Sequence, residues 1–243
     1  TCYDIKIAKE GTSPSGSEKV NMENLPEIIS AVKKEGKAIV APKRMRVTYT
    51  LTVDTNAVPA GKIIRCWLPY PRQDQARQQD VKFISASEPQ YTFSSPECRH
   101  STLYMEKRAV EGEPTVFSET FEFTANGEWH NLKPEDVQPY DTTTALYKEY
   151  TAEREKHIVF SPRLRELAAK LTAGETNPYL KAKRIFRWVN DNFPWASARE
   201  YSTIENIPEY VLDNRHGDCG QVSLLFITLC RISGIPAHFQ SGF

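Results

Sequence analysis

The sequence lacks an excess of charge of either sign, because 31 basic residues balance 31 acidic ones over 243 residues. A nucleic-acid-binding protein usually carries a basic excess or a basic stripe, and this chain has neither, so we expect no nucleic-acid partner. It also lacks any apolar run near the roughly 20 residues that a membrane helix needs, so we expect no membrane span. The remaining composition, 40% hydrophobic and 26% charged, is typical of a globular protein.

Paired cysteine motifs are missing as well. The cysteines are scattered, odd in number and never at CxxC spacing; they are Cys2, Cys66, Cys98, Cys219 and Cys230. This pattern indicates neither a zinc site nor a disulfide scaffold, and at least one thiol should be free. No H-E-x-x-H or comparable metal motif occurs, so we expect no metal and no cofactor.

Hydrophobic periodicity divides the chain into three parts. Residues 1–43 have the pattern of a leader, or of the remnant of an upstream region, with a predicted helix over residues 24–36. Residues 44–135 have a period of two, with short strands separated by turn-forming segments, which predicts an antiparallel β-sandwich. Residues 136–243 are mainly helical in pattern. The predicted fold class is therefore α+β.

The predicted sandwich is rich in aromatic residues. Three of them share one face of a predicted strand, and Glu119 interrupts that face. These three are Phe117, Phe121 and Phe123. We interpret the aromatic residues, including Trp67 and Tyr104, as core packing rather than as a ligand site.

The second half contains three predicted helices before its last segment. Ser161 precedes the first helix and Asn177 the second, and a proline follows each of them, as is common at helix starts. The third helix is short, over residues 203–214. A strand-like pattern returns only at residues 236–243.

A nearly all-apolar run follows Cys219 and predicts a central, buried helix. Its apolar residues are Val222, Leu224, Leu225, Phe226, Ile227, Leu229 and Ile232. In the first turn, unpaired backbone N–H groups and the positive end of the helix dipole favour a thiolate and can hold the oxyanion of a tetrahedral intermediate. Cys230, deep in the same helix, should be a buried and unreactive thiol. From position alone, a purely structural Cys219 fits equally well.

The segment GDCGQVSLLFITLCRISGIPAHFQSGF, residues 217–243, resembles the cysteine-helix motif of the transglutaminase-like superfamily. The shared features are a G-x-C start, a small-and-apolar helix, an R-x-x-G-I-P-A end and a final strand closing on G-F. The segment NPYLKAKRIFRWVNDNFPWA, residues 177–196, is similar to the preceding helix of bacterial members. The resemblance covers about residues 160–243, and the sandwich is compatible with the accessory domains of bacterial members.

The resemblance implies a papain-like core in which a cysteine at a helix N-terminus is the nucleophile, here Cys219. A His and an Asp on later strands complete the family's triad. A tryptophan upstream of the cysteine lends its indole N–H to the oxyanion, and Trp195 is the candidate, with Tyr201 behind it. Simple packing at a helix end is an equally good interpretation of Trp195.

No His and no Asp follows the predicted strand that ends at Phe243. We therefore expect the chain to break off inside the catalytic domain, before the catalytic His and Asp, and to be inactive by itself. His216, three residues before the cysteine, and His238, on the strand after its helix, are interpreted as loop or packing histidines. The other histidines show no spacing that ties them to the cysteine; they are His100, His130 and His157.

These observations predict a cysteine enzyme that attacks a peptide or carboxamide bond, forms a thioester at Cys219 and passes the acyl group to water or an amine. The expected partner is a protein, peptide or amide substrate, with hydrolysis favoured over crosslinking and an extracytoplasmic bacterial location favoured. The alternative is a non-catalytic binding or scaffold module with a degenerate transglutaminase-like domain. A cysteine peptidase without transglutaminase ancestry would keep the same nucleophile.

Truncation has a further expected consequence. A nearly all-apolar helix without its following sheet should expose apolar surface around residues 224–229, so we expect self-association through this surface.

Overall fold

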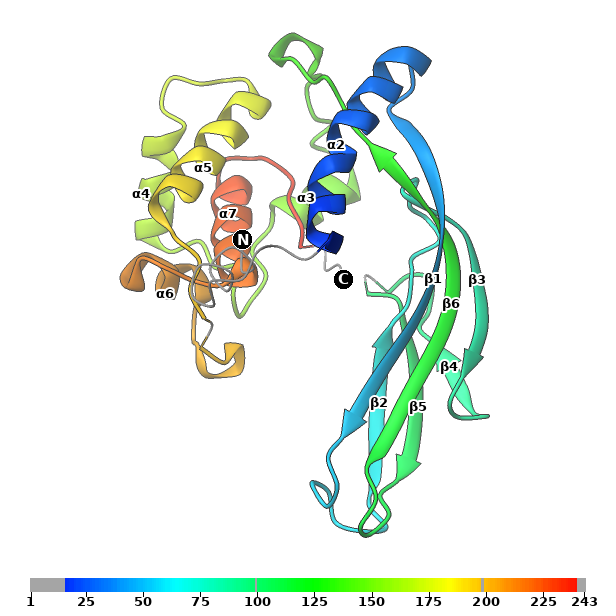
Figure 1. The fold of residues 1–243 in the computed structure, drawn as a ribbon. Helices are drawn as coiled ribbons and strands as arrows, with labels where there is room; N and C mark the ends of the chain where they lie inside the picture. The colour runs from blue at the N-terminus through cyan, green and yellow to red at the C-terminus, as the bar shows by residue number, and fades with distance from the viewer. Residues whose placement is uncertain (1–15, 99, 198, 240–243) are drawn as a thin grey trace. The chain divides into compact units, whose positions relative to one another are not determined.

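The computed structural model describes residues 16–98, 100–197 and 199–239, which fall into two compact units. One unit spans Gly16–His130, and the other contains the chain from Asn131 onward. Helices and antiparallel sheets are both present, which confirms the α+β fold class (Figure 1). Residues 1–15 of the predicted leader lie outside the described residues.

The first unit combines a helix with two antiparallel sheets. Its elements are α2 Gly16–Glu35, β1 Ile39–Val53, β2 Ile63–Pro69, β3 Gln78–Ala86, β4 Tyr91–Phe93, β5 Thr102–Arg108 and β6 Thr115–Glu128. One sheet has the strand order β1-β6-β3 and the other β2-β5-β4. Leu68 and Leu103 of one sheet share a buried core with Phe117 of the other, so the sheets pack face to face as the predicted sandwich.

Trp67 does not lie in the sandwich core, so its interpretation as core packing is wrong. Because side chains alternate along β2, the buried Cys66 and Leu68 place Trp67 on the outer face, where it is 59% exposed. Its ring lies 4.9 Å from that of Tyr104, the residue opposite on β5. The pair forms an aromatic patch on the outside of this sheet.

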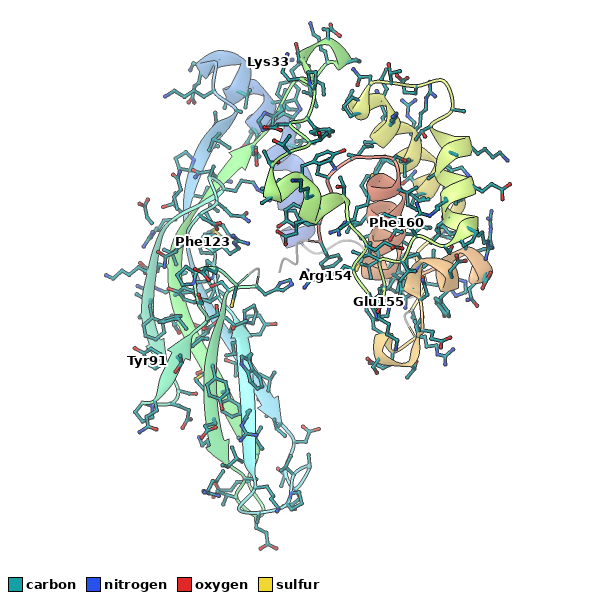
Figure 2. All side chains as sticks on the ribbon, turned by 180° about the vertical axis from the view of Figure 1, so that it is seen from behind. Lys33, Tyr91, Phe123, Arg154, Glu155 and Phe160 are labelled. Atoms are coloured by element: carbon teal, nitrogen blue, oxygen red, sulfur yellow. The ribbon has the colours of Figure 1, made fainter. Side chains whose placement is uncertain are left out.

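Helix α2 packs on the first sheet and is longer than the predicted helix. It begins at Gly16 rather than near residue 24 and includes Pro26, because the upstream SEKVNMEN segment contains good helix formers. A Cβ at Gly127 of β6 would lie 2.7 Å from the Ile28 side chain, so glycine allows the close approach. Lys33, near the end of α2, holds its Nζ 6.0 Å from the Trp129 ring centroid (Figure 2).

The second unit is helical over its described residues. Its helices are α3 Ala145–Thr151, α4 Pro162–Leu171, α5 Pro178–Asn192, α6 Ile207–Asn214 and α7 Cys219–Ile232, with 3₁₀ turns at Pro134–Asp136 and Tyr201–Thr203. The Ser161 and Asn177 side chains cap α4 and α5, which confirms both predicted helix starts. Residues 236–239 of the predicted last strand are not in a strand, and residues 240–243 lie outside the described part.

The cysteine helix α7 lies in the middle of this unit, with α4 and α5 on one side and α3 on the other (Figure 1). Leu225 and Leu229 are fully buried and Ile227 is 5% exposed. The predicted exposure of these three residues is therefore wrong, and Leu225 and Leu229 share a buried core with residues of α4, α5 and α6. Leu224 and Phe226 are partly buried.

A tight loop joins α3 to α4. Two backbone hydrogen bonds between Arg154 and Ile158 close it, and Figure 2 labels Arg154 and Glu155 in this loop.

No helix among the described residues is long and apolar enough to cross a membrane.

Candidate active site

A capping box fixes the start of α7 at Cys219. Asp218 is the N-cap: its side chain accepts a hydrogen bond from the backbone N–H of Gln221 at 2.8 Å. In return, the side-chain oxygen of Gln221 accepts a hydrogen bond from the backbone N–H of Asp218 at 3.2 Å. This reciprocal pair places Cys219 as the first residue of the helix, with an exposed side chain.

Cys230 lies about three turns further along α7. It is only 1% exposed, as predicted, and burial raises the pKa of its thiol to about 12. The thiol therefore stays uncharged near neutral pH and is a poor nucleophile. One helix thus presents one thiol to solvent and buries the other.

The first turn of α7 offers donors for a negatively charged oxygen. The Asp218 side chain satisfies the N–H of Gln221, and the Asp218 carbonyl accepts the N–H of Val222 at 3.0 Å. The backbone N–H groups of Cys219 and Gly220 have no intrahelical acceptor. Together with the positive end of the helix dipole, these two groups can stabilise an oxyanion beside the sulfur.

Trp195 lies beside the start of α7. Its backbone forms a parallel bridge with Gly217, two residues before the cysteine, and the Ala196 N–H donates to the Gly217 carbonyl at 3.1 Å. The indole Nε1 atom is buried and has no hydrogen-bond partner among the described residues. Leaving a buried N–H without an acceptor costs about 1–3 kcal/mol. A ligand oxygen that accepts a hydrogen bond from this indole N–H would remove that cost.

A hydrogen-bond network joins the loop after Trp195 to the helix cap. The Tyr201 hydroxyl donates to the Asp218 carboxylate, and the Gln221 amide donates to the Arg199 carbonyl at 3.2 Å. A Cβ at Gly220 would overlap the Tyr201 hydroxyl oxygen, so only glycine fits beside this phenol. The network fixes the loop against the first turn of α7.

The structure places His238 far from Cys219. The His238 ring stacks on Tyr150 of α3, with ring centroids 4.8 Å apart. The neighbouring Ala237 carbonyl accepts a hydrogen bond from Arg231, in the last turn of α7. Because Arg231 is twelve residues beyond Cys219, the two lie about 18 Å apart along the helix axis. His238 therefore belongs to the opposite end of α7.

His216 and His130 do not pair with Cys219 within the described residues. His216 is partly buried in the segment between α6 and α7, and no hydrogen bond joins it to Cys219. His130 pairs with Glu128 in the sandwich unit, at 2.8 Å. Over the same described residues, no group of three or more His, Cys, Asp or Glu is placed to hold a metal ion.

Two comparisons found known proteins to which the chain is similar. Residues 165–243 match the family model of the transglutaminase-like superfamily, which confirms the resemblance over this part of the chain. The fold is similar to the crystal structure of a candidate cysteine protease from Cytophaga hutchinsonii, with a TM-score of 0.60 and 17% sequence identity. The similarity covers 82% of this chain and 66% of that one, so this chain spans just under two thirds of its length. No curated protein matches the chain.

Two interactions of the site were missed by the sequence analysis. The capping pair Asp218 and Gln221 has a local signal, since an acidic residue followed three positions later by Gln before an apolar run is typical of a capping box. The contact of Tyr201 with Asp218 joins residues 17 positions apart and has no such signal.

Proposed function

We propose that Cys219 is the nucleophile of a transglutaminase-like cysteine enzyme that acts on peptide or carboxamide bonds. One observation carries the proposal: the exposed Cys219 begins a central helix, and the backbone of Trp195 bridges Gly217 two residues before it, while the buried indole N–H of Trp195 has no partner among the described residues. The family match over residues 165–243 supports it.

In the proposed reaction the Cys219 thiolate attacks the carbonyl carbon, and a C–S bond forms while the carbonyl π electrons move to oxygen. The Trp195 indole N–H and the Cys219 backbone N–H donate hydrogen bonds to this oxyanion. Collapse of the intermediate breaks the C–N bond, and the amine leaves with a proton. The resulting thioester then transfers its acyl group to water or to a second amine.

The reaction also needs a general base, which takes the thiol proton and delivers one to the leaving amine. His238 cannot serve, because its stacking on Tyr150 holds it at the far end of α7. We propose that a segment outside the described residues supplies the base. The chain by itself should then accept an acyl group from an activated donor but turn over very slowly.

Thiol labelling tests the proposal. Under limiting iodoacetamide at pH 7, Cys219 should react several-fold faster than Cys98, because Cys219 lies in the first turn of α7, where unpaired backbone N–H groups and the positive end of the helix dipole stabilise negative charge. Cys98 is the matched reference because it is also exposed, and the buried Cys230 should remain unlabelled. Mass spectrometry of peptides from the folded chain gives all three rates. Equal rates for Cys219 and Cys98 would contradict the nucleophile assignment.

A binding module is the second candidate function. It is favoured by the outward-facing Trp67, which is 59% exposed and contacts Tyr104 on the sandwich surface. Exposed aromatic residues of this kind are common at binding surfaces. In this interpretation the transglutaminase-like unit is a scaffold, and Cys219 labels no faster than Cys98.

A further inference from the structure

Tyr201 lies against the first turn of α7 through a contact that glycine makes possible. It opens the 3₁₀ turn Tyr201–Thr203, and its hydroxyl occupies the space where a Cβ of Gly220 would lie. The next phenol atom, Cζ, is 3.2 Å from that Cβ position. The hydroxyl is therefore packed against the backbone of the residue that follows Cys219.

The same hydroxyl holds one oxygen of the helix cap. Asp218 Oδ1 accepts hydrogen bonds both from the Tyr201 hydroxyl and from the Gln221 N–H, the latter at 2.8 Å. Burial, followed by the hydrogen bond and the charge of Asp218, raises the pKa of the Tyr201 phenol well above its usual range. The phenol therefore keeps its proton and remains a donor at neutral pH.

A carboxylate next to the nucleophile disfavours its reaction unless a hydrogen bond shares the negative charge and fixes the carboxylate in place. Asp218 directly precedes Cys219, so its negative charge opposes both a thiolate and an approaching electron-rich substrate oxygen. A hydrogen bond from a neutral phenol shares that charge and fixes the carboxylate over the helix end. Asp218 can then cap the helix while Cys219 reacts at the same N-terminus.

We infer that Tyr201 is a positioning residue of the Cys219 site, whose hydroxyl keeps the Asp218 carboxylate on the helix cap and shields the sulfur from its charge. This inference rests on the proposed function of Cys219. It assigns Tyr201 no contact with substrate, because Tyr201 acts through Asp218.

Two alkylating reagents of different charge test the inference. In the full chain, Tyr201→Phe should slow the reaction of Cys219 with anionic iodoacetate about three-fold more than its reaction with neutral iodoacetamide, because the Asp218 charge is less shielded. The control is Tyr147→Phe, which removes another tyrosine hydrogen bond of this unit, to the Gly234 carbonyl at 3.2 Å. That control should leave the ratio of the two rates unchanged.

A second variant separates charge from structure. In an Asp218→Asn background, adding Tyr201→Phe should no longer change the rate ratio, because the shielded charge is gone. If Tyr201 only supports the fold, both reagents slow equally and the effect persists in this background, which overturns the inference. An unchanged rate ratio in Tyr201→Phe overturns it as well.

The proposed function can fail separately. If Cys219 of the unmodified chain reacts no faster than Cys98, the nucleophile assignment fails and the inference falls with it. If Cys219 passes that comparison and Tyr201→Phe leaves the rate ratio unchanged, only the inference on Tyr201 is wrong.

Discussion

Replacing Glu119 with glutamine should stabilise the sandwich unit by about 3 kcal/mol at pH 8 and remove most of the pH dependence of its unfolding between pH 4.5 and 7. Glu119 is 1% exposed on the inner face of β6, and both its carboxylate oxygens lack a hydrogen-bond partner among the described residues. Burial raises the pKa of this carboxyl from its ordinary 4.5 to about 7.

The direction of the effect follows from these two pKa values. In the folded chain the neutral carboxyl is preferred, so between pH 4.5 and 7 the folded state binds more protons than the unfolded state. The contribution of Glu119 to the free energy of unfolding is therefore fully present below about pH 4.5 and is lost as pH rises through 7. Cys66 and Tyr70 face the same interior, and burial followed by the charge of Glu119 raises the pKa of both, so both stay neutral and neither changes its charge between pH 4.5 and 7.

The buried thiol of Cys66 allows this prediction to be measured in the intact chain. Cys66 is 5% exposed in the sandwich core, so it should react with a pulse of dithiodipyridine only after that unit unfolds. Urea titrations at pH 5 and pH 8 then give the unfolding free energy of this unit. Glu122→Gln is the matched control, because Arg46 and Arg44 hold the pKa of Glu122 below its ordinary value. A wild-type unfolding free energy that is equal at both pH values would contradict the prediction.

Replacing Arg231 with methionine should destabilise the helical unit by about 3 kcal/mol. Arg231 is 5% exposed, and its guanidinium donates to the carbonyls of Ala237 and Ala152, each at 2.8 Å, and of Glu149 at 3.4 Å. These bonds join the chain after α7 to the end of α3. Methionine fills similar volume but leaves the buried carbonyls without their donor.

Protection of the buried Cys230 thiol measures unfolding of the helical unit, just as protection of Cys66 measures unfolding of the sandwich unit. The urea midpoint for Cys230 protection should fall strongly in Arg231→Met and less in Arg231→Lys, which keeps a charged donor without the planar fork. Arg187→Met, at an exposed position of α5, should change stability by no more than about 0.5 kcal/mol. A loss below about 1 kcal/mol in Arg231→Met would show that the carbonyls find other partners.

Local signals explain the parts of the fold that could be predicted. Ser161 and Asn177, each followed by proline, define helix starts within a few residues, and both cap their helices in the structure. The apolar run after Cys219 predicted a central helix because a helix without a polar face must be covered. Both signals depend on neighbours in the sequence.

The orientation of β2 could not be predicted in the same way. Its two faces carry alternate residues, and both rows contain large apolar side chains, such as Leu68 on one and Trp67 on the other. A period of two shows that a strand has two faces but not which face meets the core. Pairing with β5 and packing against β6 decide it, and both are long-range.

The same difference between local signals and long-range contacts applies to the candidate site. The position of Cys219 at the exposed start of α7 was predictable from the local pattern, whereas the positions of the histidines depend on where distant segments meet. The stacking of His238 on Tyr150 joins residues 88 positions apart and removes His238 from the site. Glu119 is an intermediate case, because its place among phenylalanines was visible in the sequence but its lack of a partner was not.

Acylation by p-nitrophenyl acetate tests the central claim, that Cys219 is the nucleophile, most directly. The chain should release one equivalent of p-nitrophenolate in a burst with little turnover, and mass spectrometry should locate the acetyl group on Cys219. Cys219→Ala should abolish the burst, and Trp195→Phe should slow it at least about ten-fold through loss of an oxyanion donor. Acetylation that is spread over other side chains and persists unchanged in Cys219→Ala would contradict the account.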